Sequence, residues 1–159
     1  MPNDAVLDAT RRLDLDRFLP YRLSILSNKV SDAIARHYSE RFGLSVPEWR
    51  IMAVLGQTSG LSAGEVARRT AMDKVQVSRA AAALVATRRL QRDGDEADGR
   101  VTRLSLTAKG RTIYDEIAPL ALHLEAVLLA ALTHEERRTL DGLMDKLARQ
   151  VDSIETIRS

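Results

Sequence analysis

The sequence predicts a mainly α-helical (α+β) chain of six helices with one two-stranded β-hairpin, and three observations support this prediction. Alanine, leucine and arginine dominate a composition that is 45% hydrophobic but only 4% aromatic, which favours helices over sandwiches and barrels. Apolar residues recur at steps of three and four over long stretches, as they do on one face of a helix. Several segments open with Ser, Thr or Asp followed three residues later by Glu or Gln, the pattern of a helix capping box.

The first two helices are predicted at residues 16–41 and 47–57. The apolar spacing marks the first of them, and Gly43 supplies its stop signal. A capping box of Ser45 and Glu48, with proline in the first turn, opens the second. The residues expected to face the core are Trp49, Met52, Ala53 and Leu55.

Two short helices and the hairpin come next. Capping boxes at Ser62–Glu65 and Asp73–Gln76 open helices that should end near Thr70 and Arg89. Short strands are expected at residues 90–93 and 102–106, joined by the Gly- and Asp-rich loop GDEADGRV.

The last two helices are predicted at residues 108–132, with a kink at Pro119, and from a capping box at Thr133–Glu136 to about Ile154. Thr107 is the expected cap of the first. The segment IAPLALHLEAVLLAALT is apolar on more than one face, so it needs cover on both sides. A dimer interface made with the N-terminal helix would supply that cover; the alternative is a helix central to the core of one monomer.

Positive charge is concentrated in one part of the chain. Residues 68–111 hold eleven Lys and Arg against five Asp and Glu, a net charge of +6. Residues 1–67 are neutral and residues 112–159 carry −4, although the whole chain is only +2. Such a window is typical of a phosphate-binding face. The plainer alternative is a solvated helix surface.

Composition excludes several classes of protein. Without cysteine there are no disulfides, thiolate metal sites or cysteine nucleophiles. No apolar run approaches the roughly 20 residues that span a bilayer, and the first residues lack a signal segment, so a cytoplasmic protein without a membrane partner is expected. The three histidines stand far apart and no phosphate-cradling glycine loop occurs, so neither an enzyme nor a cofactor is expected. His and carboxylate groups from different helices could still converge on a metal.

Three segments in this order, LSAGEVARRT, DKVQVSRAAAAL and ADGRVTRLSLTAKG, resemble the MarR family of bacterial transcription regulators. The resemblance implies a winged helix-turn-helix DNA-binding domain over residues 46–107. It implies helical dimerisation regions over 16–45 and 108–155, whose first and last helices interlock in a homodimer. It also implies an inverted-repeat operator, bound in most cases by a repressor that a small ligand releases. The family's wing usually carries more basic residues, where this chain has Ala97 and Gly99 and retains only Arg100.

The front of the recognition helix should lie in the major groove. Gln76 and Arg79 are the residues expected to read adenine and guanine, each worth about 1–3 kcal/mol of discrimination. Lys74 and Ser78 are expected to contact bases or phosphates, and the alternative for Ser78 is a surface residue without a partner. Two further residues, Val75 and Val77, should turn inward or towards thymine methyl groups.

Other DNA contacts are expected at a helix N-terminus and in the wing. Ser62 can offer its hydroxyl and free backbone N–H groups to a phosphate. Arg100 resembles the arginine that the family inserts into the minor groove, with extra charge from Arg103 nearby. Asp98 should orient Arg100 or tie the hairpin, and the alternative is an ordinary Asp-Gly turn. Further arginines could reach the phosphate backbone, and the alternative for each is an ordinary exposed helix residue: Arg68, Arg69, Arg88 and Arg89.

The resemblance also implies a pocket for a small aromatic or anionic effector. The candidates are Arg22, His37, Trp49 and Arg50, because an arginine can hold a carboxylate and a tryptophan can stack on a ring. For each there is a plainer alternative: Trp49 as a core residue, His37 as an ordinary helix residue, and Arg22 paired with an acid of a partner chain.

Two functions of different classes remain. The first is a sequence-specific transcriptional regulator that binds double-stranded DNA as a homodimer. The second is an architectural or helical interaction protein that binds DNA without regard to sequence. The positions expected to read bases carry Gln and Ser, which favours the sequence-specific regulator. A protein that binds DNA without regard to sequence would be served by an all-basic face.

Overall fold

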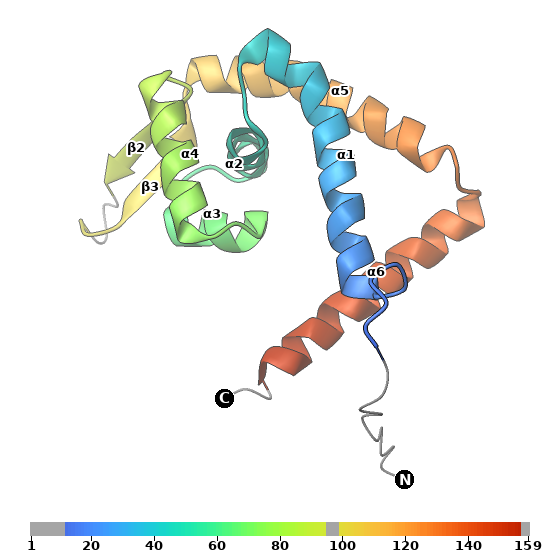
Figure 1. Cartoon of the computed structure of the whole chain (residues 1–159). Coiled ribbons are helices and arrows are strands. Elements are labelled where there is room, and N and C mark those ends of the chain that lie inside the picture. The colour runs from blue at the N-terminus through green and yellow to red at the C-terminus, as the bar shows by residue number, and fades with distance from the viewer. Residues whose placement is uncertain (1–11, 95–98, 157–159) are drawn as a thin grey trace. The chain divides into compact units, whose positions relative to one another are not determined.

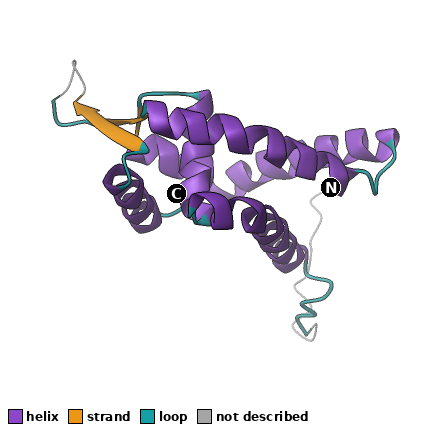
Figure 2. Cartoon of the chain, turned by 90° about the horizontal axis from the view of Figure 1, so that it is seen from above, coloured by secondary structure: helices purple, strands orange, loops and turns teal. Residues whose placement is uncertain are grey.

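The computed structural model describes residues 12–94 and 99–156, and within them the chain forms six α-helices and one small β-sheet (Figures 1 and 2). The mainly helical α+β prediction is therefore confirmed. In chain order the elements are α1 (Leu19–Phe42), α2 (Val46–Gln57), β1 (Leu61–Ser62), α3 (Ala63–Thr70), α4 (Lys74–Ala86), β2 (Leu90–Gly94), β3 (Thr102–Leu106), α5 (Ala108–Leu129) and α6 (His134–Thr156).

The chain divides into two compact units, residues 1–110 and 111–159. The first holds α1 to α4, the sheet and the start of α5, and the second holds the rest of α5 and α6. No single helix in the described part of the chain is long and apolar enough to cross a membrane. Only α5 and α6 taken together meet the requirements of length and composition, and they are bent by 109° at their junction.

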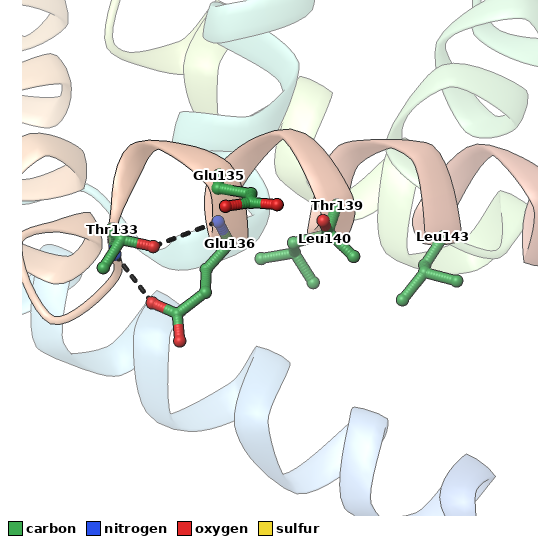
Figure 3. Close-up of a pocket in the computed structure, with 6 residues that line it drawn as sticks. All are labelled: Thr133, Glu135, Glu136, Thr139, Leu140 and Leu143. Carbon is green, nitrogen blue, oxygen red and sulfur yellow. Dashed lines mark hydrogen bonds between the residues drawn. The ribbon is translucent and has the colours of Figure 1, made fainter.

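Four helices begin with the capping boxes that the sequence predicts. In α2 the Ser45 N–H donates to Glu48 Oε2 over 2.7 Å, and the Glu48 N–H donates to Ser45 Oγ over 3.3 Å. Each box satisfies N–H groups that have no partner inside the helix, and losing such a cap typically costs about 0.5–2 kcal/mol. Figure 3 shows the equivalent exchange at the start of α6. The four boxes are Ser45–Glu48, Ser62–Glu65, Asp73–Gln76 and Thr133–Glu136.

Helix ends differ from the predictions by up to three residues. Gly43 ends α1 as predicted, in the left-handed conformation (φ 62°), with its N–H bonded to the Ser39 carbonyl over 2.8 Å. The helix begins at Leu19 rather than residue 16, because Arg17 N–H closes a turn onto Asp14. At the other end of the chain α5 stops at Leu129 instead of residue 132, whereas α6 continues two residues past the predicted end.

The end predicted for the recognition helix, near Arg89, is wrong: α4 stops at Ala86. Arg88 adopts the left-handed conformation with φ 57°, which turns the chain out of the helix. The Arg89 N–H then bonds to the Leu84 carbonyl over 2.8 Å, which closes the helix end. The two residues therefore form a tight connection into β2.

The sheet has three strands in the order β1-β3-β2, where the sequence predicts two. The predicted hairpin pairs Leu90 with Leu106 and Gly94 with Thr102. The third strand, β1, has only two residues, and it pairs antiparallel to the other edge of β3. Two residues are too few for an alternating pattern, which is why the sequence contains no signal for this strand.

The core of the first unit lies where α2 packs on α3 and α4. Met52 and Leu55 are fully buried as predicted, and so is Ile51. Trp49 and Ala53, also predicted to face the core, are only partly buried. Further buried side chains come from other parts of this unit, among them Tyr38, Leu44, Val66, Val77, Leu84, Leu90 and Leu104.

The start of α5 is anchored against the end of α4. Thr107 caps α5 as predicted, since its Oγ1 accepts from the Gly110 N–H over 3.1 Å and donates to the Arg88 carbonyl over 2.7 Å. Gly110 lies against the Arg89 carbonyl group so closely that a Cβ atom there would overlap its oxygen. The position therefore requires glycine for reasons of space.

Replacing Gly110 with alanine should destabilise the fold by about 1–3 kcal/mol, because the new methyl group must displace backbone. The matched control is Gly142→Ala in α6, where a Cβ meets nothing within 4 Å. That change should be neutral or stabilise by up to about 1 kcal/mol, because alanine favours helix. Chemical denaturation of both variants measures the difference. Equal stability of the two variants would contradict the close approach at Gly110.

Candidate nucleic-acid interface

Helices α3 and α4 form a helix-turn-helix whose turn is fixed by its own residues. Ala71 adopts the left-handed conformation with φ 52°, and Met72 is buried in the bend. The Thr70 hydroxyl donates to the Val66 carbonyl over 2.7 Å, which satisfies the one buried polar side chain described in this unit. The β2–β3 hairpin follows α4 and packs against it through β2 (Figure 1).

The recognition helix α4 has a buried face and an exposed face. Its buried residues are Val77, Ala80, Ala81 and Leu84. The candidate DNA-contacting residues Lys74, Gln76, Ser78 and Arg79 are all exposed. The two valines, each expected to turn inward or towards thymine methyl groups, differ: Val77 is 1% exposed and Val75 is 58% exposed.

Gln76 is exposed, and it also takes part in the capping box at the start of α4. Its backbone N–H donates to Asp73 Oδ1 over 2.7 Å, and its Oε1 accepts from the Asp73 N–H over 3.3 Å. A bidentate contact with adenine needs both ends of the amide. Such a contact would therefore have to break half of the capping box, whereas donation from Nε2 alone would leave the cap intact.

Ser62, expected to meet a phosphate, has its hydroxyl already bonded. Its Oγ donates to Glu65 Oε2 over 2.7 Å, and its N–H donates to the same oxygen over 2.8 Å. The bond from the Ser62 backbone is the main cause that lowers the pKa of the Glu65 carboxyl. An ionised carboxylate at this helix start opposes an approaching phosphate, so the geometry gives Ser62 a capping role in the free chain.

Arg103, expected to add positive charge to the wing, pairs with the same carboxylate. Its Nη1 donates to Glu65 Oε2 over 3.1 Å and to the Gly60 carbonyl over 3.4 Å. About a third of each charged side chain is exposed. The pair ties the central strand β3 to the start of α3, and sequence gives no sign of it because the residues are 38 positions apart.

The other arginines proposed for the phosphate backbone fall into two groups. Arg69 is exposed but donates to Thr58 Oγ1 over 3.0 Å, and Arg89 is half-buried with its guanidinium bonded to the Phe42 carbonyl. Arg89 therefore acts inside the fold in the free chain. Arg68 and Arg88 are exposed.

The wing is described only in part. Arg100 is exposed in the turn before β3, and the loop residue Asp98 lies outside the described residues together with Ala97. The predicted interaction of Asp98 with Arg100 thus stays a prediction. The strands that carry this loop are both confirmed, with β3 at the predicted bounds and β2 one residue longer.

Among the hollows described for residues 12–94 and 99–156, none has all four effector candidates in its walls. Arg22 lines an open hollow of about 420 Å³ beside Leu19 and Leu26, and the other three candidates are not among its walls. His37 is exposed, whereas Trp49 lies 5.6 Å from the ring of buried Tyr38.

Trp49 and Arg50 are nevertheless both held in the structure near α1. Arg50 Nη2 donates to Ser31 Oγ over 3.2 Å. Burial raises the pKa of the Tyr38 phenol to about 12, despite the opposing effect of Arg50. Tyr38 is therefore neutral at physiological pH, and its buried ring contacts the partly buried ring of Trp49.

A second hollow, which the sequence does not predict, lies on α6 (Figure 3). It measures about 490 Å³, and Glu135, Glu136, Leu140 and Leu143 are among its walls. Its two carboxylates oppose an anionic ligand. Within the described residues no group of three His, Asp or Glu side chains is placed to hold a metal ion.

A helix-turn-helix with an exposed polar recognition face, followed by a β-hairpin, defines a winged helix-turn-helix protein of the DNA-binding class. Residues 42–101 match the model of the MarR family. An HTH-type transcriptional repressor of Mycobacterium tuberculosis is 28% identical over 131 residues, which cover 82% of this chain and 91% of the relative.

Solved structures agree with this match. A MarR/EmrR family transcriptional regulator from Acinetobacter superposes with a TM-score of 0.81 at 28% identity, covering 89% of this chain and 99% of that one. The BpsR regulator of Bordetella bronchiseptica, whose DNA binding is regulated by 6-hydroxynicotinic acid, has a TM-score of 0.72 at 23% identity, with coverage of 82% and 98%. The chain is therefore similar to the MarR family of transcriptional regulators, which are DNA-binding proteins and not enzymes.

Replacing Arg103 with methionine should lower the melting temperature by roughly 1–3 °C, because a partly exposed ion pair and its carbonyl bond are lost. The matched control is Arg92→Met on the adjacent strand β2, an exposed arginine that removes the same charge. Thermal unfolding followed by circular dichroism compares them. If Arg103→Met melts no lower than Arg92→Met, then the Arg103–Glu65 pair does not stabilise the domain.

Proposed function

We propose that this protein is a repressor that binds an inverted-repeat operator as a homodimer and leaves it when a small ligand binds. The observation that carries the proposal is the recognition helix, whose buried face anchors it while its polar residues face solvent. An exposed face that mixes an arginine, a glutamine and a serine offers several kinds of base contact. Because the target is chromosomal DNA, the proposed location is the cytoplasm.

In this proposal Arg79 reads a guanine, since its guanidinium can bond both O6 and N7 from an exposed position. Gln76 donates one bond from Nε2 and keeps its Oε1 on the cap. Lys74 and Ser78 contact neighbouring bases or phosphates. Arg100 enters the minor groove from the wing, with Asp98 as its orienting partner.

The proposed homodimer is supported by apolar side chains that remain exposed in each unit. In the first unit these lie at the start of α1, where Leu19 is 46% and Leu26 is 57% exposed. In the second unit Leu122 of α5 is 65% exposed. An apolar surface on this scale favours a partner surface over water. The α6 residues exposed by 41–55% are Leu140, Leu143, Met144, Leu147, Val151 and Ile154.

The proposed dimerisation regions are the predicted ones, residues 16–45 and 108–155, and the proposed DNA-binding domain is 46–107. A two-fold dimer would present its recognition helices about 34 Å apart, one turn of DNA. An inverted repeat follows from that symmetry.

The proposed effector is a small aromatic or anionic compound, such as the acid that regulates the Bordetella protein. Arg50 is partly buried and Arg22 lines an open hollow, so each could meet a carboxylate. Trp49 supplies an aromatic face nearby on α2, and His37 is the fourth candidate. For the effector to release the protein from DNA, it must bind more tightly to a dimer whose recognition helices no longer fit the operator.

The Arg79→Ala variant should bind the operator about 5- to 150-fold more weakly, the equivalent of about 1–3 kcal/mol for one guanine contact. The operator is first obtained by repeated binding and amplification of random duplexes. Fluorescence anisotropy at one salt concentration then gives the affinity for the selected duplex and for a scrambled one.

The control variant Lys146→Ala removes a positive charge outside the basic window and should leave both affinities unchanged. For Arg79→Ala the loss should be confined to the selected duplex. An equal loss on both duplexes would mean that Arg79 contacts phosphate only, and it would favour DNA binding without regard to sequence.

A further inference from the structure

Val75 is an exception to the burial pattern of its domain. Among described residues between positions 27 and 121, it is the one large hydrophobic side chain that is exposed, at 58%. The Val75 side chain adds little to the stability of α4, because valine is a poorer helix former than alanine. The cap of the helix is made by Asp73 and Gln76. The exposed methyl groups therefore have no evident role in the folded chain on its own.

The position of Val75 on α4 is central to the exposed face. With about 100° between successive residues, Val75 lies roughly 170° from the middle of the buried face. Arg79 lies on the same line one turn later, followed by Ala82 and Ala86, which are small and exposed. Lys74 and Gln76 lie on the two flanks. A groove that receives this helix would thus meet Val75 and Arg79 first.

The base edges in the major groove present hydrogen-bond donors and acceptors. The apolar group among them is the C5 methyl of thymine. Valine cannot bond the polar groups, and covering them without a bond costs free energy. We propose that Val75 is a specificity-determining residue that recognises a thymine methyl group. This inference rests on the proposed function, in which α4 enters the major groove.

The spacing of Val75 and Arg79 restricts where that thymine lies. Side chains four residues apart on a helix have Cβ atoms about 5–6 Å apart. Successive base pairs are about 3.4 Å apart. The thymine in each half-site therefore lies one or two base pairs from the guanine that Arg79 reads.

The test removes the methyl group from each partner in turn. Each thymine of the selected operator is replaced with deoxyuridine, symmetrically in both half-sites, and binding is measured for the wild type and for Val75→Ala. The wild type should lose roughly three- to tenfold at one position per half-site. The Val75→Ala variant should bind the unmodified operator more weakly than the wild type by a similar factor. At the sensitive position it should bind thymine and uracil equally well.

Substitutions of the other thymines are the internal control and should affect both proteins equally. Val75→Ala should melt at the same or a higher temperature than the wild type, which separates a lost contact from a lost fold. If the wild type binds the selected operator but Val75→Ala keeps the same thymine preference, or no thymine near the guanine matters, this inference is wrong and the proposed function stands. Failure to select any operator would instead overturn the proposed function itself.

Discussion

The connection between the recognition helix and the wing depends on three residues, Thr87 to Arg89. Arg88 turns the chain with a left-handed backbone, and Arg89 closes the end of α4 with its N–H. The Arg89 carbonyl then accepts the Thr107 N–H over 3.1 Å, while its guanidinium bonds the carbonyl at the end of α1. Lys109 adds a bond of 3.0 Å to the Thr87 carbonyl. Within the first unit, the ends of α1, α4 and β3 and the start of α5 therefore meet at this connection.

This constraint holds the recognition helix at its C-terminal end, and the capping box of Asp73 and Gln76 fixes where the helix begins. Between them the buried residues of α4 pack on α2. Arg103 and Glu65 join the central strand of the wing to the start of α3. A helix fixed in this way presents its exposed side chains in one arrangement, so DNA binding does not have to order its backbone first.

The sequence predicts the parts of this fold that local chemistry determines. Each capping box is readable because both partners stand three residues apart, and Gly43 marks a helix end because glycine tolerates positive φ. The end of α4 is not readable, since Thr87, Arg88 and Arg89 contain no such signal and arginine favours helix. Strand β1 is too short for a pattern.

The candidate site divides in the same way. Exposure of Lys74, Ser78 and Arg79 follows from helical periodicity, whereas the partner of Arg103 is set by tertiary packing. The two valines are separated by the same periodicity, because Val77 shares a helix face with Ala80, Ala81 and Leu84 whereas Val75 lies opposite. The effector candidates follow from the family resemblance and from no local pattern, and of the four the structure places Trp49 and Arg50 close to α1.

The most direct test of the central claim is capture of chromosomal DNA fragments by the purified protein with competitor DNA present, followed by sequencing of what is retained. A regulator of this kind should retain one inverted repeat whose half-sites lie about one helical turn apart, next to a promoter. Enrichment without any shared repeat, lost evenly as salt is raised, would contradict sequence-specific regulation and leave a non-specific DNA-binding protein.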